Sequence, residues 1–176
     1  LVKLMGRDSG FIAASAALSI SEVNFVLIPE ITFDLYGTSG FLKILRKRLE
    51  ERHHSVIVVA EGAGQEFFGE ACNDKDASGN TKHKDIGVYL KDKISEEFKH
   101  NEFPFSIKYI DPSYIIRSAP ANPNDSKFCN LLAQNAVHGA LAGKTDFVVG
   151  VWNDHFTLMP IPMVGAKRKK IDVVSE

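Results

Sequence analysis

The hydrophobic and polar positions of this chain follow two alternating patterns. Short runs of β-branched and aromatic residues predict strands, and longer stretches with apolar residues three or four apart predict helices. The predicted strands cover residues 2–4, 24–28, 55–60, 105–110, 147–151 and 156–159, and the predicted helices cover residues 8–20, 40–53, 85–99 and 124–141. Strands that alternate with helices in this way favour a three-layer α/β/α domain with a mainly parallel sheet.

Two segments depart from this alternation. Residues 69–83 are rich in Gly, Asn and Asp and predict a mobile loop, whereas the last two strands follow each other across Asn153-Asp154 and indicate a hairpin. No long linker interrupts the chain, so we expect residues 1–176 to form a single domain. Because Leu1 lies inside a predicted strand and no initiator Met precedes it, we expect a fragment of a longer protein.

Composition narrows the class of protein. The chain is 44% hydrophobic and 24% charged, which is typical of a globular protein, and no apolar run approaches the ~20 residues of a membrane span. A net charge of −1 argues against binding to nucleic acid, and we interpret the basic residues 167–170 as a solvated tail. Cys72 and Cys129 have no metal-site spacing, so we expect no metal site and a reduced, cytoplasmic location.

The strongest chemical signal lies at residues 108–117. Lys108 falls inside a predicted strand that Asp111-Pro112 ends, and Tyr114 and Arg117 follow, three positions apart. Open α/β sheets bind ligands at the carboxyl ends of their strands. Arginine offers a planar fork of donors that fits phosphate oxygens, so this stretch predicts a site for an anionic ligand.

Two other predicted strands end in residues suited to the same ligand. Met5-Gly6-Arg7 stands where a strand gives way to a helix, so that Gly6 lets a ligand approach the backbone and the helix amides favour an anion. Glu30 follows Pro29 after the second strand. Its carboxylate can accept hydrogen bonds from sugar hydroxyls.

Each of these residues also has an ordinary interpretation. Taken alone, Arg7 is a surface arginine in a turn, Glu30 a solvated glutamate and Lys108 a lysine at a strand edge. The turn at residues 61–65 superficially suggests a dinucleotide fingerprint, but Phe67 occupies the position of the third glycine. A combination of motifs is therefore needed to choose between the interpretations.

Such a combination is present, and with it the chain resembles the 6-phosphofructokinases. The resemblance runs from Val2 to about Pro160 and is closest to the branch of plants, trypanosomatids and spirochaetes. It rests on motifs in a fixed order, at residues 5–7, 29–30, 61–65, 76–80, 108–117 and 131–140. The resemblance implies a phosphofructokinase-like fold and identifies the chain as the acceptor-substrate half of a larger two-domain kinase.

The resemblance also implies a reaction. The whole enzyme would phosphorylate fructose 6-phosphate at its C1 hydroxyl in glycolysis, giving fructose 1,6-bisphosphate. Arg7 would be the catalytic cation near the moving phosphoryl group and would also contact the substrate, with Met5, Gly6 and Glu30 at the sugar.

For the 6-phosphate, the resemblance implies Lys108, Tyr114 and Arg117. Tyr114 stands where bacterial members usually have histidine. Lys108 matches a cation that reaches into the site of a neighbouring subunit, so the resemblance implies a homo-oligomer with shared active sites.

Other family motifs are absent from the chain. Neither the Gly-Gly-Asp donor loop nor the Thr-x-Asp-x-Asp segment occurs, so Mg²⁺ and the donor, ATP or pyrophosphate, would be bound mainly by the absent half. The isolated fragment should therefore be inactive, and the style of its motifs favours ATP. Three alternatives remain: a non-catalytic sugar-phosphate-binding or regulatory module, a pyrophosphate-dependent enzyme, and a nucleotide-binding domain that uses the turn at residues 61–65.

Overall fold

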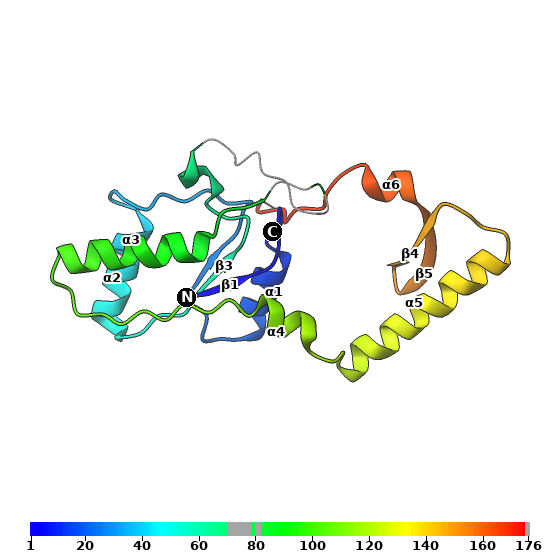
Figure 1. Cartoon of the computed structure of the whole chain (residues 1–176), viewed down its shortest axis with the longest axis horizontal. Coiled ribbons are helices and arrows are strands. Elements are labelled where there is room, and N and C mark those ends of the chain that lie inside the picture. Colours follow the sequence, from blue (N-terminus) through cyan, green and yellow to red (C-terminus); the bar gives the residue numbers. More distant parts are fainter. Residues whose placement is uncertain (70–78, 80–81, 175–176) are drawn as a thin grey trace. The chain divides into compact units, whose positions relative to one another are not determined.

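The computed structural model describes residues 1–69, 79 and 82–174. Most of the loop predicted at residues 69–83 lies outside the described residues. The chain divides into two compact units, Leu1–Arg117 with Lys170–Glu176, and Ser118–Lys169. Figure 1 labels the elements of both units, and each unit is described by itself. The single domain expected from the sequence stays a prediction.

The first unit is built on a parallel sheet whose strands occur where the sequence predicts them. Strands β1 (Val2–Leu4), β2 (Phe25–Leu27) and β3 (Ile57–Ala60) pair in the order β1-β3-β2. All four residues of the central strand β3 are buried. A parallel strand covered on both faces needs such a continuous apolar run.

Helices cover both faces of this sheet, which confirms the three-layer arrangement (Figure 1). On one face, α1 (Phe11–Ser19) packs Ala13 against Val58 and Ala60 of β3. On the other face, α2 (Phe41–Arg52) and α3 (Ile86–His100) enclose a larger core. That core contains Leu45, Ile57, Val59, Ile86, Leu90, Ile94 and Phe98.

The prediction of a strand at residues 105–110 was wrong. The segment meets β1 at one parallel bridge, between Val2 and Ile110, and is otherwise extended. Among the described residues, residues 105–109 form no strand ladder with another segment. Asp111 follows, and its side chain accepts a hydrogen bond from the Ser113 amide at the start of α4 (Ser113–Ser118).

The second unit consists of α5 (Pro123–Leu141), the hairpin β4 (Phe147–Trp152) and β5 (His155–Pro160), and the short helix α6 (Ile161–Gly165). The antiparallel hairpin is confirmed, and Asn153 and Asp154 both have positive φ, as a tight two-residue turn requires. Helix α5 begins one residue before its predicted start, with Asn122 as its N-cap, because Pro123 fits the first helical position.

None of the helices among the described residues has both the length and the apolar character to cross a membrane.

Candidate functional site

Three loops follow the carboxyl ends of the parallel strands. Residues 5–7 follow β1, Glu30 follows β2 and residues 61–62 follow β3. The first and third loops are in direct contact, because a Cβ atom added to Gly62 would collide with the carbonyl oxygen of Arg7. Gly62 therefore allows the backbone of Arg7 to lie against the turn after β3.

Arg7 lines a cavity of about 290 Å³ at this edge of the sheet. The other lining residues are Lys3, Glu61, Lys82, His83, Lys84 and Asp85. The Lys3 ammonium is paired with two carboxylates, at 2.8 Å from Asp85 Oδ2 and 2.9 Å from Asp111 Oδ2. The lining therefore contains the basic residues Lys3, Arg7, Lys82 and Lys84 and the carboxylates of Glu61 and Asp85.

Met5 and Arg117, which are far apart in the sequence, are brought together. The Arg117 Nε–H group donates to the sulfur of Met5 at 3.2 Å, so the end of α4 reaches the loop after β1. Tyr114 lies one helical turn before Arg117, and 82% of its surface is exposed. The structure thus gathers Met5, Gly6, Arg7 and α4 at one edge of the sheet, and their roles toward a ligand stay predictions.

The Glu30 carboxylate is engaged with backbone amides. The Gly10 amide lies 3.0 Å from each of its oxygens, and the Ile171 amide lies 3.0 Å from Oε1. Burial alone would raise the pKa of Glu30, but the hydrogen bonds from Ile171 and Gly10 outweigh it and the pKa is lowered. Glu30 therefore fixes the start of α1, and its contact with a sugar stays a prediction.

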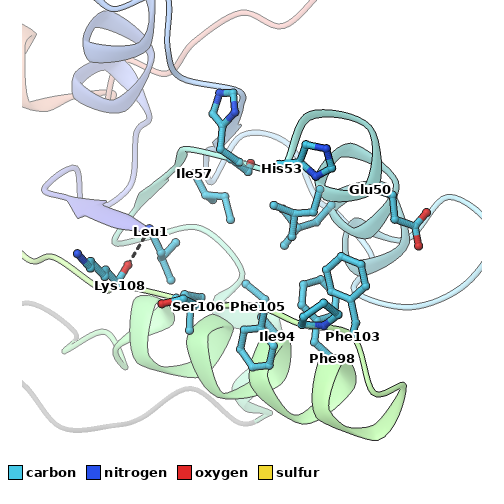
Figure 2. A pocket seen from close by; sticks show the side chains of 16 residues that line it. Leu1, Glu50, His53, Ile57, Ile94, Phe98, Phe103, Phe105, Ser106 and Lys108 are labelled. Carbon is cyan, nitrogen blue, oxygen red and sulfur yellow. Dashed lines mark hydrogen bonds between the residues drawn. The ribbon is translucent and has the colours of Figure 1, made fainter.

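Lys108 lies elsewhere. It is exposed and lines a second cavity, of about 850 Å³, at the amino-terminal ends of β1 and β3. Figure 2 shows this cavity, with the Lys108 carbonyl accepting from the Leu1 ammonium at 2.9 Å and a group of Phe98, Phe103 and Phe105 on its wall. The structure does not bring Lys108 to the cavity of Arg7, and its role across a subunit interface stays a prediction.

One polar network was missed by the sequence reasoning. Lys3 links Asp85, which caps α3, to Asp111, which precedes α4, and the Tyr109 hydroxyl donates to Asp85 at 2.9 Å. Burial alone would lower the pKa of Lys3. Its hydrogen bonds to Asp85 and Asp111 outweigh the effect of burial, so the pKa of Lys3 is raised above its usual value. The sequence did contain one signal of this network: Lys3 lies inside an apolar strand, where a charged side chain needs a partner.

Gln65 forms a second clamp that the sequence did not reveal. Its side-chain nitrogen donates to the carbonyl oxygens of Glu61 at 2.9 Å and of Lys84 at 3.0 Å. Its side-chain oxygen accepts from the Lys84 amide at 3.2 Å. The backbone at residue 84 is therefore tied to the turn after β3.

Within residues 1–69, 79 and 82–174, no three or more His, Cys, Asp or Glu side chains are grouped as a metal ion would require.

Comparison with known proteins gives a consistent result. A family model described as phosphofructokinase matches residues 1–140. The chain is 53% identical to an ATP-dependent 6-phosphofructokinase of Borreliella burgdorferi, over 98% of this chain and 40% of the relative. It is 48% identical to a chloroplastic ATP-dependent 6-phosphofructokinase of Arabidopsis thaliana, over 98% and 32%, and 42% identical to one of Trypanosoma brucei brucei, over 98% and 35%.

Solved structures share the fold. A pyrophosphate-dependent phosphofructokinase from Marinobacter aquaeolei matches with a TM-score of 0.68 at 20% identity, over 98% of this chain and 41% of that chain. The chain spans 40% or less of the length of the three curated relatives above. With a family match over residues 1–140 and the motifs of the spirochaete, plant and trypanosome branch in place, this chain belongs to the phosphofructokinase family.

Proposed function

We propose that this chain supplies the sugar-phosphate site of an ATP-dependent 6-phosphofructokinase. The reaction transfers the γ-phosphoryl group of ATP to the C1 hydroxyl of fructose 6-phosphate, and the hydroxyl proton is released as ADP and fructose 1,6-bisphosphate form. The observation that carries the proposal is the meeting of Met5 and Arg117 beside the loop of Arg7. Two sequence motifs with cationic side chains thereby share one edge of the sheet, where open α/β folds bind ligands.

We assign the residues of this edge different roles toward the substrate. Arg117 and Tyr114 hold the 6-phosphate, because a guanidinium and a phenol can both donate to phosphate oxygens. Met5, Gly6 and Glu30 position the sugar. Arg7 stabilises the charge on the moving phosphoryl group, which is the main demand that phosphoryl transfer makes on a protein.

The remaining parts of the reaction lie outside this chain. The donor and the Mg²⁺ ion that neutralises its phosphates are held mainly by other parts of the protein, which also supply the base for the C1 hydroxyl. ATP is preferred over pyrophosphate because the relatives at 42–53% identity quoted above are named ATP-dependent. The protein acts in the cytoplasm as a homo-oligomer in which Lys108 completes a neighbouring site.

A coupled assay tests this function directly. The intact protein is incubated with fructose 6-phosphate, Mg²⁺ and either ATP or pyrophosphate, and fructose 1,6-bisphosphate is measured. We expect turnover with ATP. A folded protein that binds fructose 6-phosphate but turns over with neither donor would support the non-catalytic alternative instead.

A further inference from the structure

The side chain of Lys3 joins strand β1 to the segment that leads into α4. Its ammonium lies 2.8 Å from Asp85 Oδ2 and 2.9 Å from Asp111 Oδ2. We propose that Lys3 is a positioning residue for the substrate site, because it holds Asp111 and with it the start of the helix that carries Arg117. That the substrate is fructose 6-phosphate rests on the proposed function, whereas the contacts of Lys3 do not depend on it.

The Asp111 carboxylate connects Lys3 to the first turn of α4. Its Oδ2 atom faces the Lys3 ammonium, and its Oδ1 atom accepts hydrogen bonds from both the amide and the hydroxyl of Ser113. The amide of Ile116 donates to the carbonyl oxygen of Pro112 at 2.8 Å and closes the turn. Lys3 therefore acts on the helix through one intervening side chain, that of Asp111.

Helix α4 needs such a tether because it has little packing of its own. It is six residues long, and none of these residues is buried. The side chains of Tyr114 and Ile115 are 82% and 72% exposed. A helix of this length is not stable in isolation, and burial of an apolar face is what normally fixes a short helix on a protein. The contacts at the start of α4 therefore contribute strongly to the positions of Tyr114 and Arg117.

The ammonium of Lys3 is itself held from a second side. Asp85 accepts from it and from the Tyr109 hydroxyl, the latter at 2.9 Å. Asp85 is in turn fixed by the amides of Gly87 and Val88, which donate to its side chain at the start of α3. Only 13% of the Lys3 side chain is exposed, so solvent screens its ion pairs less than it screens pairs on the surface.

The backbone of Lys3 binds the same segment as its side chain. The Lys3 amide donates to the carbonyl oxygen of Ile110 at 3.0 Å, one residue before Asp111. Tyr109 lies so close to α3 that a Cβ atom added to Gly87 would fall 2.2 Å from its ring. Residues 109–111 are thus fixed to β1 and α3, and α4 starts from a defined position. Side chains that are positioned before a ligand arrives lose less entropy when they bind it.

Steady-state kinetics of the intact protein test this role through a double-mutant cycle between Lys3 and Arg117. Lys3→Met removes the ammonium but keeps the length of the side chain. Asp111→Asn is a milder second variant, because its amide oxygen can still accept from Ser113. We expect both variants to raise the KM for fructose 6-phosphate, by roughly three- to thirty-fold for Lys3→Met, while the KM for ATP stays unchanged. In an Arg117→Ala background the further effect of Lys3→Met should be much smaller, because the side chain that it positions is missing.

Two controls separate positioning from a loss of stability. Ile94→Val lowers Tm by removing a methylene group from the buried core of α3, and the core cluster to which Ile94 belongs contains no residue of α4. Its KM for fructose 6-phosphate should stay within about two-fold of the wild type. Hydrogen exchange of the α4 amides should be faster in Lys3→Met than in the wild type and unchanged in Ile94→Val.

Each outcome decides a different point. An unchanged KM for fructose 6-phosphate in Lys3→Met would overturn the positioning role, as would losses that add in full when Lys3→Met and Arg117→Ala are combined. If Lys3→Met does not fold, Asp111→Asn decides by the same measurements. If the wild type turns over fructose 6-phosphate with neither donor but α4 exchanges faster in the variant, Lys3 still positions α4 and the proposed function fails. Without turnover and with unchanged exchange, both are wrong.

Discussion

Replacing Arg117 with alanine removes the guanidinium that α4 brings to the loop after β1. The side chain is exposed, and it donates a hydrogen bond of 3.2 Å to the sulfur of Met5, a weak acceptor. The change should therefore alter the free energy of unfolding by no more than about 0.5 kcal/mol. A loss of activity can then be assigned to the ligand rather than to unfolding.

The magnitude follows from the chemistry of the lost contact. A hydrogen bond between charged groups contributes roughly 1.5–3 kcal/mol, and about 1.4 kcal/mol corresponds to a factor of ten. Arg117→Ala should therefore reduce kcat/KM for fructose 6-phosphate by roughly ten- to a hundred-fold or more. Arg117→Lys should restore part of the loss, because an ammonium keeps the charge but cannot make a bidentate contact.

Saturation kinetics of the intact protein with both substrates provide the measurement. Arg52→Ala is the matched control, since it removes an exposed arginine from the end of α2. The KM for ATP should stay unchanged in every variant. An unaltered kcat and KM for fructose 6-phosphate, together with a raised KM for ATP, would refute the assignment of Arg117 to the acceptor.

Four further predictions concern other parts of the chain. The purified 176-residue chain should show no turnover with either donor, and a rate close to that of the intact protein would refute the half-enzyme interpretation. Hybrid oligomers of Lys108→Ala and Arg117→Ala subunits should regain some activity, whereas verified hybrids without recovery would argue against a shared site. Gly62→Ala should displace the Arg7 carbonyl and destabilise the fold by about 1–3 kcal/mol, measured as a fall in Tm. A hydrogen bond from Ser113, with further help from Lys3, lowers the pKa of Asp111 from 3.8 to about 2, so stability that is present above about pH 4 should be lost as pH falls toward 2. Asp111→Asn should flatten that part of a plot of Tm against pH, and an unchanged plot would show that the ionised Asp111 carboxylate does not stabilise the fold.

The sequence predicted the elements whose signals are local. The continuous apolar run of β3 and the i, i+4 spacing of Ile86, Leu90 and Ile94 in α3 were sufficient, and the structure buries all of these residues. The prediction of a strand at residues 105–110 failed because β propensity describes a residue's preference but not its pairing, and the structure pairs the segment with β1 only at Ile110 among the described residues. The start of α5 was misplaced although Pro123 signalled it.

The sequence motifs selected the residues of the candidate site but not the contacts that hold these residues in place. Met5, Gly6 and Arg7 could be selected because they follow a strand, and α4 does bring Arg117 to them. The contact between Lys3 and Asp85 spans 82 positions, and single-sequence patterns carry no information about such pairs. The clamp of Gln65 on Lys84 is hidden for the same reason.

Strand alternation explains why these supports lie where the chemistry needs them. In β1, Val2 and Leu4 pair with Val58 and Ala60, and all four belong to the core beneath α1. Lys3 pairs with Val59 and so points to the opposite face, where α3 begins and Asp85 is within reach of its ammonium. A one-residue shift of β1 would turn Lys3 toward α1, leave Asp85 and Asp111 without their cation and release the start of α4. The position of Arg117 beside Arg7's loop thus depends on the register of a three-residue strand, because the same strand that carries Arg7 at its end also carries the lysine that fixes α4.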